Sequence, residues 1–171
     1  SSPPTVWSSV ALPGIPSGSL LLAAVARNEV WMTMSSTVQR VRGTQRTPML
    51  QVPTSESLQS IWGSGPNDVW VGGSELRHWD GSSWTIVTPA LPKPAAGTTV
   101  GTSARLTGTG PRDVWVGMDS PYQILHWDGA AWADRTPPDS LSRSPLYSMW
   151  APTEHSLWLL DANGLQRWND G

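Results

Sequence analysis

Two histidines stand in nearly identical surroundings, and each could take part in metal binding or proton transfer. His78 and His126 are both followed directly by Trp-Asp-Gly, and an acid, Asp68 or Asp113, lies upstream of each. Imidazole beside a carboxylate is a combination that metal sites and general-base catalysis both use. The same combination appears twice, however, so it first indicates a repeated structural unit whose strands must position these side chains.

A dipeptide of one aliphatic residue and Trp marks four such units, spaced roughly 40 residues apart. The four copies are Val30-Trp31, Val69-Trp70, Val114-Trp115 and Leu157-Trp158. In each unit two short apolar strands flank a polar turn and a third strand follows; in the second and third units Asp-Gly then leads into a fourth strand. Self-similarity at this period, with β-type residues in each unit, predicts an all-β protein built as a β-propeller.

The repeats predict one domain over residues 1–171, a closed four-bladed propeller with four antiparallel strands per blade. We expect the blades at about 20–48, 58–89, 104–137, and 147–171 plus 5–13. The last unit stops before its fourth strand, and Thr5 to Pro13 resembles the strand that begins at Trp84. That N-terminal strand would complete the last blade and close the ring. A fragment of a larger propeller and two chains pairing into an eight-bladed ring are the alternatives.

Composition argues against several classes of partner. The net charge is −2, only 14% of residues are charged, and Lys93 is the single lysine, so no basic surface suits nucleic acid. The absence of cysteine excludes disulfides and thiolate metal sites. No apolar run approaches the roughly 20 residues that a membrane-spanning helix needs, so we expect no membrane insertion.

Two stretches carry a family resemblance. Ser64 to Trp84 and Thr109 to Trp132 resemble tandem Trp-Asp-Gly-type propeller repeats of exported or lipoprotein-type bacterial proteins, and distantly the Asp-box hairpin of sialidase-like propellers. The resemblance implies a propeller fold and a secreted, periplasmic or cell-surface location in a bacterium. It implies no particular activity, because propellers serve as enzymes, lectins and scaffolds alike.

The repeated polar positions are predicted to be structural. The second strand of each unit begins where the antiparallel third strand ends, which brings its first residue close to the basic residue of the third strand. We therefore expect three pairs, Asp68 with His78, Asp113 with His126 and Glu29 with Arg40, that hold turn and hairpin together. We expect no catalytic residue, bound metal or cofactor.

Candidate ligand-binding residues lie where the units differ. Trp62 and Trp150 are on the first strand, which lines the central channel of propellers, so they would plug the channel or contact a ligand. The connections on one face vary in length, and binding residues usually lie on variable loops of a rigid scaffold. Those loops carry the remaining candidates: Lys93, Asp119, Tyr122 and Arg143.

The sequence favours a non-catalytic binding module that engages a protein partner through this variable-loop face, as a monomer rather than a dimer. A carbohydrate-binding, lectin-like propeller is the first alternative. A glycoside hydrolase that uses the loop carboxylates Glu75, Asp119 or Asp161 is the second, although short loops leave little room for a deep pocket.

Overall fold

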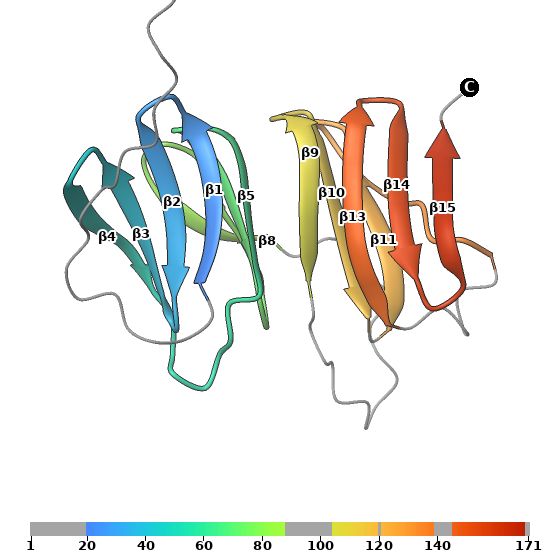
Figure 1. The fold of residues 1–171 in the computed structure, drawn as a ribbon, viewed down its shortest axis with the longest axis horizontal. Helices are drawn as coiled ribbons and strands as arrows, with labels where there is room; N and C mark the ends of the chain where they lie inside the picture. The colour runs from blue at the N-terminus through green and yellow to red at the C-terminus, as the bar shows by residue number, and fades with distance from the viewer. Residues whose placement is uncertain (1–19, 88–103, 120, 139–144, 170–171) are drawn as a thin grey trace, which may run out of the picture.

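A computed structural model of the chain describes residues 20–87, 104–119, 121–138 and 145–169. These residues form fifteen strands in four antiparallel sheets, which we number blades 1 to 4 in chain order (Figure 1). Within the described ranges, no helix is long and apolar enough to cross a membrane. The predicted closing strand, residues 5–13, lies outside the described residues.

Each blade is a meander in which consecutive strands pair. Blade 1 contains β1 (Leu20–Ala26), β2 (Glu29–Met34), β3 (Thr37–Arg42) and β4 (Gln45–Gln51). Blade 2 contains β5 (Ser60–Gly65), β6 (Asp68–Gly72), β7 (Leu76–Trp79) and β8 (Trp84–Val87). Blade 3 contains β9 (Arg105–Gly110), β10 (Asp113–Asp119), β11 (Tyr122–Trp127) and β12 (Trp132–Asp134). Blade 4 contains β13 (Leu146–Thr153), β14 (Ser156–Asp161) and β15 (Gly164–Asn169).

Short turns connect the strands as the sequence predicts. Asp80 accepts hydrogen bonds from the backbone N–H groups of Ser82 and Ser83, both at 2.8 Å, and Gly81 adopts a φ of 97° that a side chain would disfavour. Asp128 and Gly129 repeat this arrangement in blade 3. Asp-Gly therefore specifies the hairpin between the third and fourth strands of both blades.

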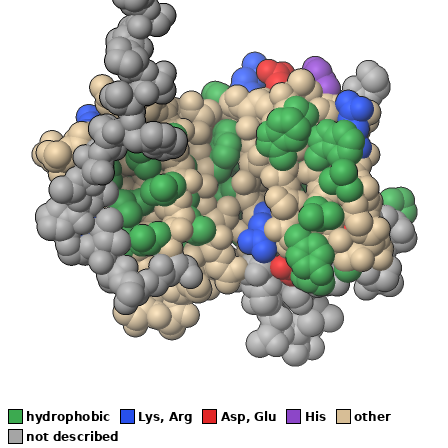
Figure 2. Space-filling model, in the orientation of Figure 1, with side chains coloured by type: hydrophobic (Ala, Val, Ile, Leu, Met, Phe, Trp, Pro, Cys, Tyr) green, Lys and Arg blue, Asp and Glu red, His purple; other side chains and the backbone are tan. Residues whose placement is uncertain are grey.

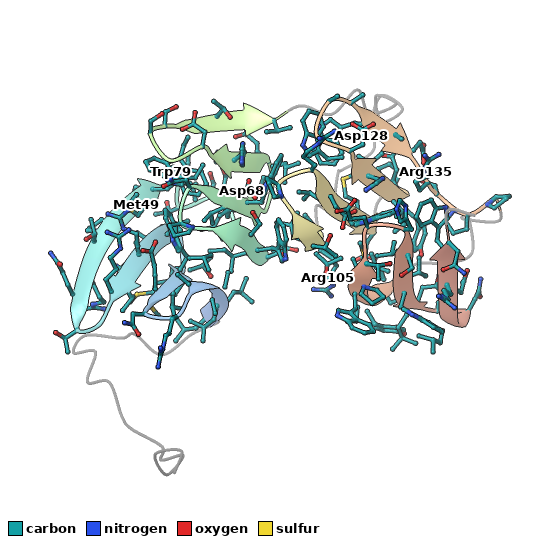
Figure 3. All side chains as sticks on the ribbon, turned by 90° about the horizontal axis from the view of Figure 1, so that it is seen from above. Met49, Asp68, Trp79, Arg105, Asp128 and Arg135 are labelled. Carbon is teal, nitrogen blue, oxygen red and sulfur yellow. The ribbon has the colours of Figure 1, made fainter. Side chains whose placement is uncertain are left out.

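The four sheets follow one another with their first strands side by side. Strand β1 contacts β5, β5 contacts β9, and β9 contacts β13 (Figure 1). No contact of similar extent joins β13 to β1 among the described residues, and no strand pairing links blade 4 to blade 1 there. Seen from above, blades 1 and 4 stand at the two ends of the row of sheets (Figure 3).

Three layers, each between two neighbouring blades, form most of the core, and a smaller buried cluster of Met32, Met34 and Val41 belongs to blade 1. The first lies between blades 1 and 2 around Trp31, the second between blades 2 and 3 around Trp70, and the third between blades 3 and 4 around Trp115. These three Trp residues are 0–3% exposed. We call each layer a joint, since its apolar side chains join one blade to the next.

Candidate functional site

The three joint tryptophans share one hydrogen-bonding arrangement. Each indole Nε1 donates to an acid two residues earlier on the same strand: Trp31 to Glu29 at 2.9 Å, Trp70 to Asp68 at 2.9 Å and Trp115 to Asp113 at 3.0 Å. A buried indole N–H needs such a partner. The alternation of strand residues places acid and Trp on the same side of the sheet.

The two repeated histidines complete this arrangement in blades 2 and 3. Nε2 of His78 lies 2.7 Å from Asp68, and Nε2 of His126 lies 2.7 Å from Asp113. The imidazole rings stack on Trp70 and Trp115, with ring centroids 4.1 and 4.0 Å apart. The structure thus brings both predicted Asp–His pairs together. In each pair, Nε2 of the imidazole contacts the Asp carboxylate and one face of the ring stacks on Trp.

Asp68 shows the electrostatic effect of this environment. Burial raises the pKa of its carboxyl group, but hydrogen bonds from His78, Ser64 and Trp70 lower it by more in total. The pKa of Asp68 therefore lies below its ordinary value of 3.8. The carboxylate is held ionised by its own blade, as a structural acceptor requires.

The third predicted pair, Glu29 with Arg40, is wrong, because Glu29 pairs with a different arginine. Glu29 accepts a hydrogen bond from Nε of Arg42, not from Arg40. Arg40 lies opposite Trp31, as His78 lies opposite Trp70 in blade 2, but blade 1 has a further basic residue, Arg42, directly opposite Glu29. The Arg40 guanidinium instead stands 6.0 Å from the centre of the Trp31 ring.

Trp62 and Trp150 do not plug a central channel as expected. Trp62 packs into the joint between blades 2 and 3, where a Cβ on Gly108 would stand only 2.9 Å from its ring. Trp150 lies on the corresponding side of blade 4 and is 62% exposed. Each lies opposite the tryptophan on the second strand of its blade, Trp70 or Trp158, and so shares its side of the sheet.

The loop carboxylates are bound to neighbouring structural groups. Asp161, 2% exposed, accepts a hydrogen bond from the Tyr122 hydroxyl at 2.9 Å, which ties blade 3 to blade 4. Asp119 accepts from the backbone N–H of Leu146 at the start of β13. Glu75 pairs with Arg77. In the described part of the chain, no group of three or more His, Asp or Glu could hold a metal ion.

Lys93 and Arg143, the two basic loop candidates, lie outside the described residues, so their expected role in binding stays a prediction.

The first strands of all four blades border one cavity of about 310 Å³. It lies at the end where these strands begin, which is also the end that carries the variable loops. Its lining comes from Leu21, Leu22, Gln59, Ser60, Ile61, Arg105, Leu106, Tyr147, Ser148 and Met149. Figure 3 shows Arg105 between the two halves of the row of sheets.

The lining of this cavity combines exposed aromatic surface with hydrogen-bond donors. Tyr147 is 55% exposed and supplies a phenol. Nε of Arg105 donates to the carbonyl of Leu146 at 3.3 Å, which anchors the guanidinium at the cavity wall. The hydroxyl of Ser60 accepts from the backbone N–H of Leu106, so its own proton points elsewhere. Such a lining suits a ligand that carries acceptor groups.

Sequence reasoning missed Arg105 and Tyr147 as candidates. Arg105 stands where the other three units hold Leu21, Ser60 and Ser148, so it interrupts the repeat. That departure at an otherwise small or apolar position was the available signal.

Comparisons with known proteins show which fold the chain has, but they assign it to no family. No protein-family model matches the chain, and no curated protein sequence matches it. Solved structures do match: YCF48 bound to D1 peptide has a TM-score of 0.54 and 16% identity, over 96% of this chain and 70% of that one. A virginiamycin B lyase from Staphylococcus aureus has a TM-score of 0.62 and 13% identity, over 85% and 49%. A chain of a nidogen/laminin complex has a TM-score of 0.60 and 11% identity, over 86% and 58%.

These similarities define the class of protein. All three neighbours are β-propeller proteins, and four consecutive meander sheets with their first strands side by side match that architecture. The chain spans 49 to 70% of the length of these neighbours. It is therefore a propeller-type repeat protein.

Proposed function

We propose that this protein is a non-catalytic binding module that holds a segment of a partner protein over the cavity at the start of its four first strands. The observation that supports this most directly is the cavity itself, since every blade contributes to it and Tyr147 and Arg105 offer aromatic and donor groups there. Tyr and Arg are among the residue types that contribute most to binding energy at protein interfaces. The location follows the sequence resemblance: an exported protein of a bacterium.

Two further observations support this proposal. Proteins with this fold occur in complexes with a peptide, for YCF48, and with a protein, for the nidogen/laminin pair. The carboxylates that a glycoside hydrolase would need, Asp119, Asp161 and Glu75, are each engaged with structural partners. A general acid or nucleophile must instead face the substrate.

Selection from a phage-displayed peptide library tests the proposal. Enriched peptides should bind the wild-type protein and lose at least about tenfold in affinity in Tyr147→Ala and in Arg105→Ala, because both changes remove contacts from the cavity. Arg27→Ala is the matched control, since Arg27 is exposed on a turn at the opposite end of blade 1. Equal binding by all three variants would contradict the site. A glycan array in which sugars bind through Tyr147 would replace the protein partner with a carbohydrate.

A further inference from the structure

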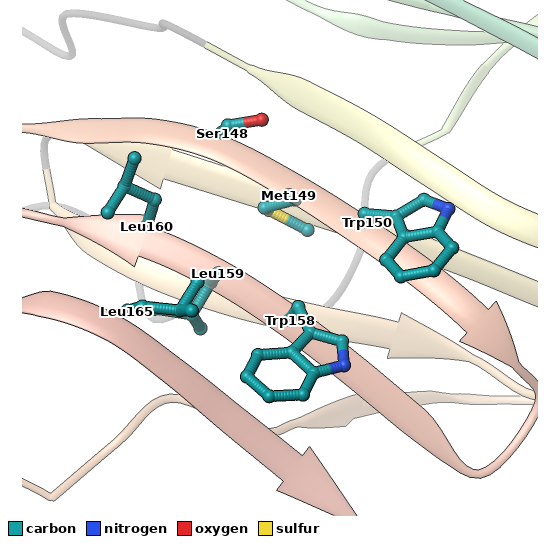
Figure 4. Close-up of a pocket in the computed structure, with 7 residues that line it drawn as sticks. All are labelled: Ser148, Met149, Trp150, Trp158, Leu159, Leu160 and Leu165. Atoms are coloured by element: carbon teal, nitrogen blue, oxygen red, sulfur yellow. The ribbon is translucent and has the colours of Figure 1, made fainter.

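The cavity at the start of the four first strands is layered by depth. Residues of these strands that pair with equivalent residues of the second strands lie at the same level, and each step along a strand leads about 3.3 Å deeper. The outer level of the lining consists of Leu21, Ser60, Arg105 and Ser148, and the inner level of Leu22, Ile61, Leu106 and Met149. Figure 4 shows Ser148 and Met149, one from each level, as successive residues of β13. A largely polar level therefore lies above an entirely apolar one.

Arg105 is the one charged residue among the described residues that line the cavity. Its Nε donates to the carbonyl of Leu146, but it forms an ion pair with no carboxylate in the described part of the chain. Asp119, which also contacts Leu146, accepts from the backbone N–H of that residue instead. The two terminal nitrogens of the Arg105 guanidinium are thus available to a ligand.

The surroundings of Arg105 favour an anionic ligand. The Ser60 hydroxyl accepts from the backbone N–H of Leu106, which leaves its own proton to donate, and the exposed Ser148 adds a second hydroxyl at the same level. On the face shown in Figure 2, few charged side chains appear, and hydrophobic side chains lie over blades 1 and 4. A positive charge in largely apolar surroundings attracts an anion more strongly than it would in open water.

We propose that the cavity takes the C-terminal end of a peptide chain, with the terminal carboxylate on Arg105 and the apolar side chain of the last residue on the inner level. This inference rests on the proposed function and names the part of the partner segment that enters the cavity. A guanidinium binds a carboxylate through two parallel N–H···O bonds, and the two terminal nitrogens of Arg105 can supply that pair. Capture of a terminal carboxylate is a recurring mode of peptide recognition.

The layering favours the end of a chain over an internal acidic residue. In a last residue the carboxylate and the side chain leave the same Cα, so one residue contacts two levels that are about 3.3 Å apart. An internal Asp or Glu also supplies a carboxylate, but its backbone continues in both directions. The cavity volume of about 310 Å³ is near the lower limit of ordinary ligand pockets, roughly 300 Å³, and leaves little room for two continuing chains.

Paired peptides that differ only in their end group test this inference. Each peptide has a Gly/Ser-rich stem with a dye at its N-terminus, ends in Leu, Val, Ala or Asp, and is made with a free carboxylate and as the C-terminal amide. Fluorescence anisotropy should show that the wild-type protein binds the free acids ending in Leu or Val at least about tenfold more tightly than their amides, because the amide loses the charge-assisted hydrogen bonds.

Two Arg variants assign that preference to the cavity. Arg105→Gln should bring the ratio of acid to amide affinity close to one. Arg27→Gln, the same change on an exposed turn at the opposite end of blade 1, should preserve the ratio. Because the ratio compares two peptides on one variant, it does not depend on how much of that variant is folded.

Leu22→Ala tests the inner level. Leu22 is 67% exposed, so the variant should fold. Its preference for a last Leu over a last Ala should fall about threefold, because the change removes apolar contact from the last side chain. An unchanged preference would mean that the last side chain does not reach the inner level.

The outcomes separate this inference from the proposed function. Equal binding of acids and amides by the wild-type protein overturns the terminal carboxylate, and so does a preference for acids that Arg105→Gln retains. Amides ending in Asp that bind as tightly as free acids ending in Leu also overturn it, since a side-chain carboxylate then suffices. In all three cases a peptide that still requires Tyr147 leaves the binding module standing. If no peptide of this set or of the displayed library binds, the proposed function fails and this inference fails with it.

Discussion

Removing the Asp113 carboxylate should destabilise the protein far more than the equivalent change in blade 4. Asp113 is 2% exposed and accepts four hydrogen bonds: from Thr109 N at 3.0 Å, Thr109 Oγ1 at 2.7 Å, Trp115 Nε1 at 3.0 Å and His126 Nε2 at 2.7 Å. In Asp113→Ala the indole N–H of Trp115 stays buried without an acceptor, which costs about 1 to 3 kcal/mol, whereas the donors of the exposed Thr109 can turn to water. The hydrogen bond between His126 and the charged carboxylate, worth about 1.5 to 3 kcal/mol, is lost as well, so we expect a loss of about 4 kcal/mol.

The measurement is thermal or urea unfolding followed by tryptophan fluorescence. For a chain of this size, 4 kcal/mol lowers the melting temperature by about 8 to 16 °C. The matched control is Ser156→Ala, because Ser156 holds the same position in blade 4 and its hydroxyl shares a hydrogen bond with Thr153 Oγ1 at 2.9 Å. This change should cost about 1 kcal/mol. If both variants lose the same stability, the Asp113 cluster does not hold blade 3 together and the reasoning fails.

Three further outcomes are expected. Gly117→Ala should cost about 1 to 3 kcal/mol in urea unfolding because its Cβ would meet blade 4 side chains at 2.3 and 2.4 Å, whereas Gly65→Ala, with nothing within 4 Å, should cost less than half as much. Tyr122→Phe removes the hydroxyl that hydrogen-bonds to Asp161 across blades 3 and 4, so the free energy of unfolding should fall by about 1 kcal/mol. An unchanged urea midpoint would show that this hydrogen bond does not stabilise the contact between the two blades. The free energy of unfolding should fall on acidification. The pKa of Asp80, which is lowered mainly by the hydrogen bond from the Ser83 backbone N–H, lies below the ordinary value of 3.8, and so does the pKa of Asp68. Both carboxylates therefore contribute fully to stability above that pH and lose their contribution as the pH falls below it. Melting temperatures from pH 7 to pH 2 measure this, with Asp68→Asn and Asp80→Asn flattening the decline.

The strands and both Asp–His pairs could be predicted because their determinants are local. Asp-Gly encodes the hairpin at Asp80, and the alternation of residues on β6 and β7 places Asp68 and His78 on one side of a blade. These features depend on a few consecutive residues or on two strands joined by a short turn. A single sequence therefore contains enough information for them.

The orientation of Trp62 and the partner of Glu29 could not be predicted in the same way. The register between β5 and β6 shifts between Gly63 and Gly65, and the space for the Trp62 ring exists because Gly108 of the next blade has no side chain. Glu29 has two basic residues on the neighbouring strand, Arg40 and Arg42, and the repeat aligns only Arg40 with His78 and His126. The cavity beside Arg105 requires all four blades in place. Its lining residues are far apart in the sequence.

The serial packing of blades has a consequence for how the chain opens. Each joint connects only consecutive blades, so the free energy of opening is a sum of nearest-neighbour contributions, as in a linear array. Among the described residues, blades 2 and 3 each take part in two joints, while blade 4 takes part in the Trp115 joint. Within the described part of the chain, amide protection should therefore be highest at β6 and β10, whose blades each take part in two joints.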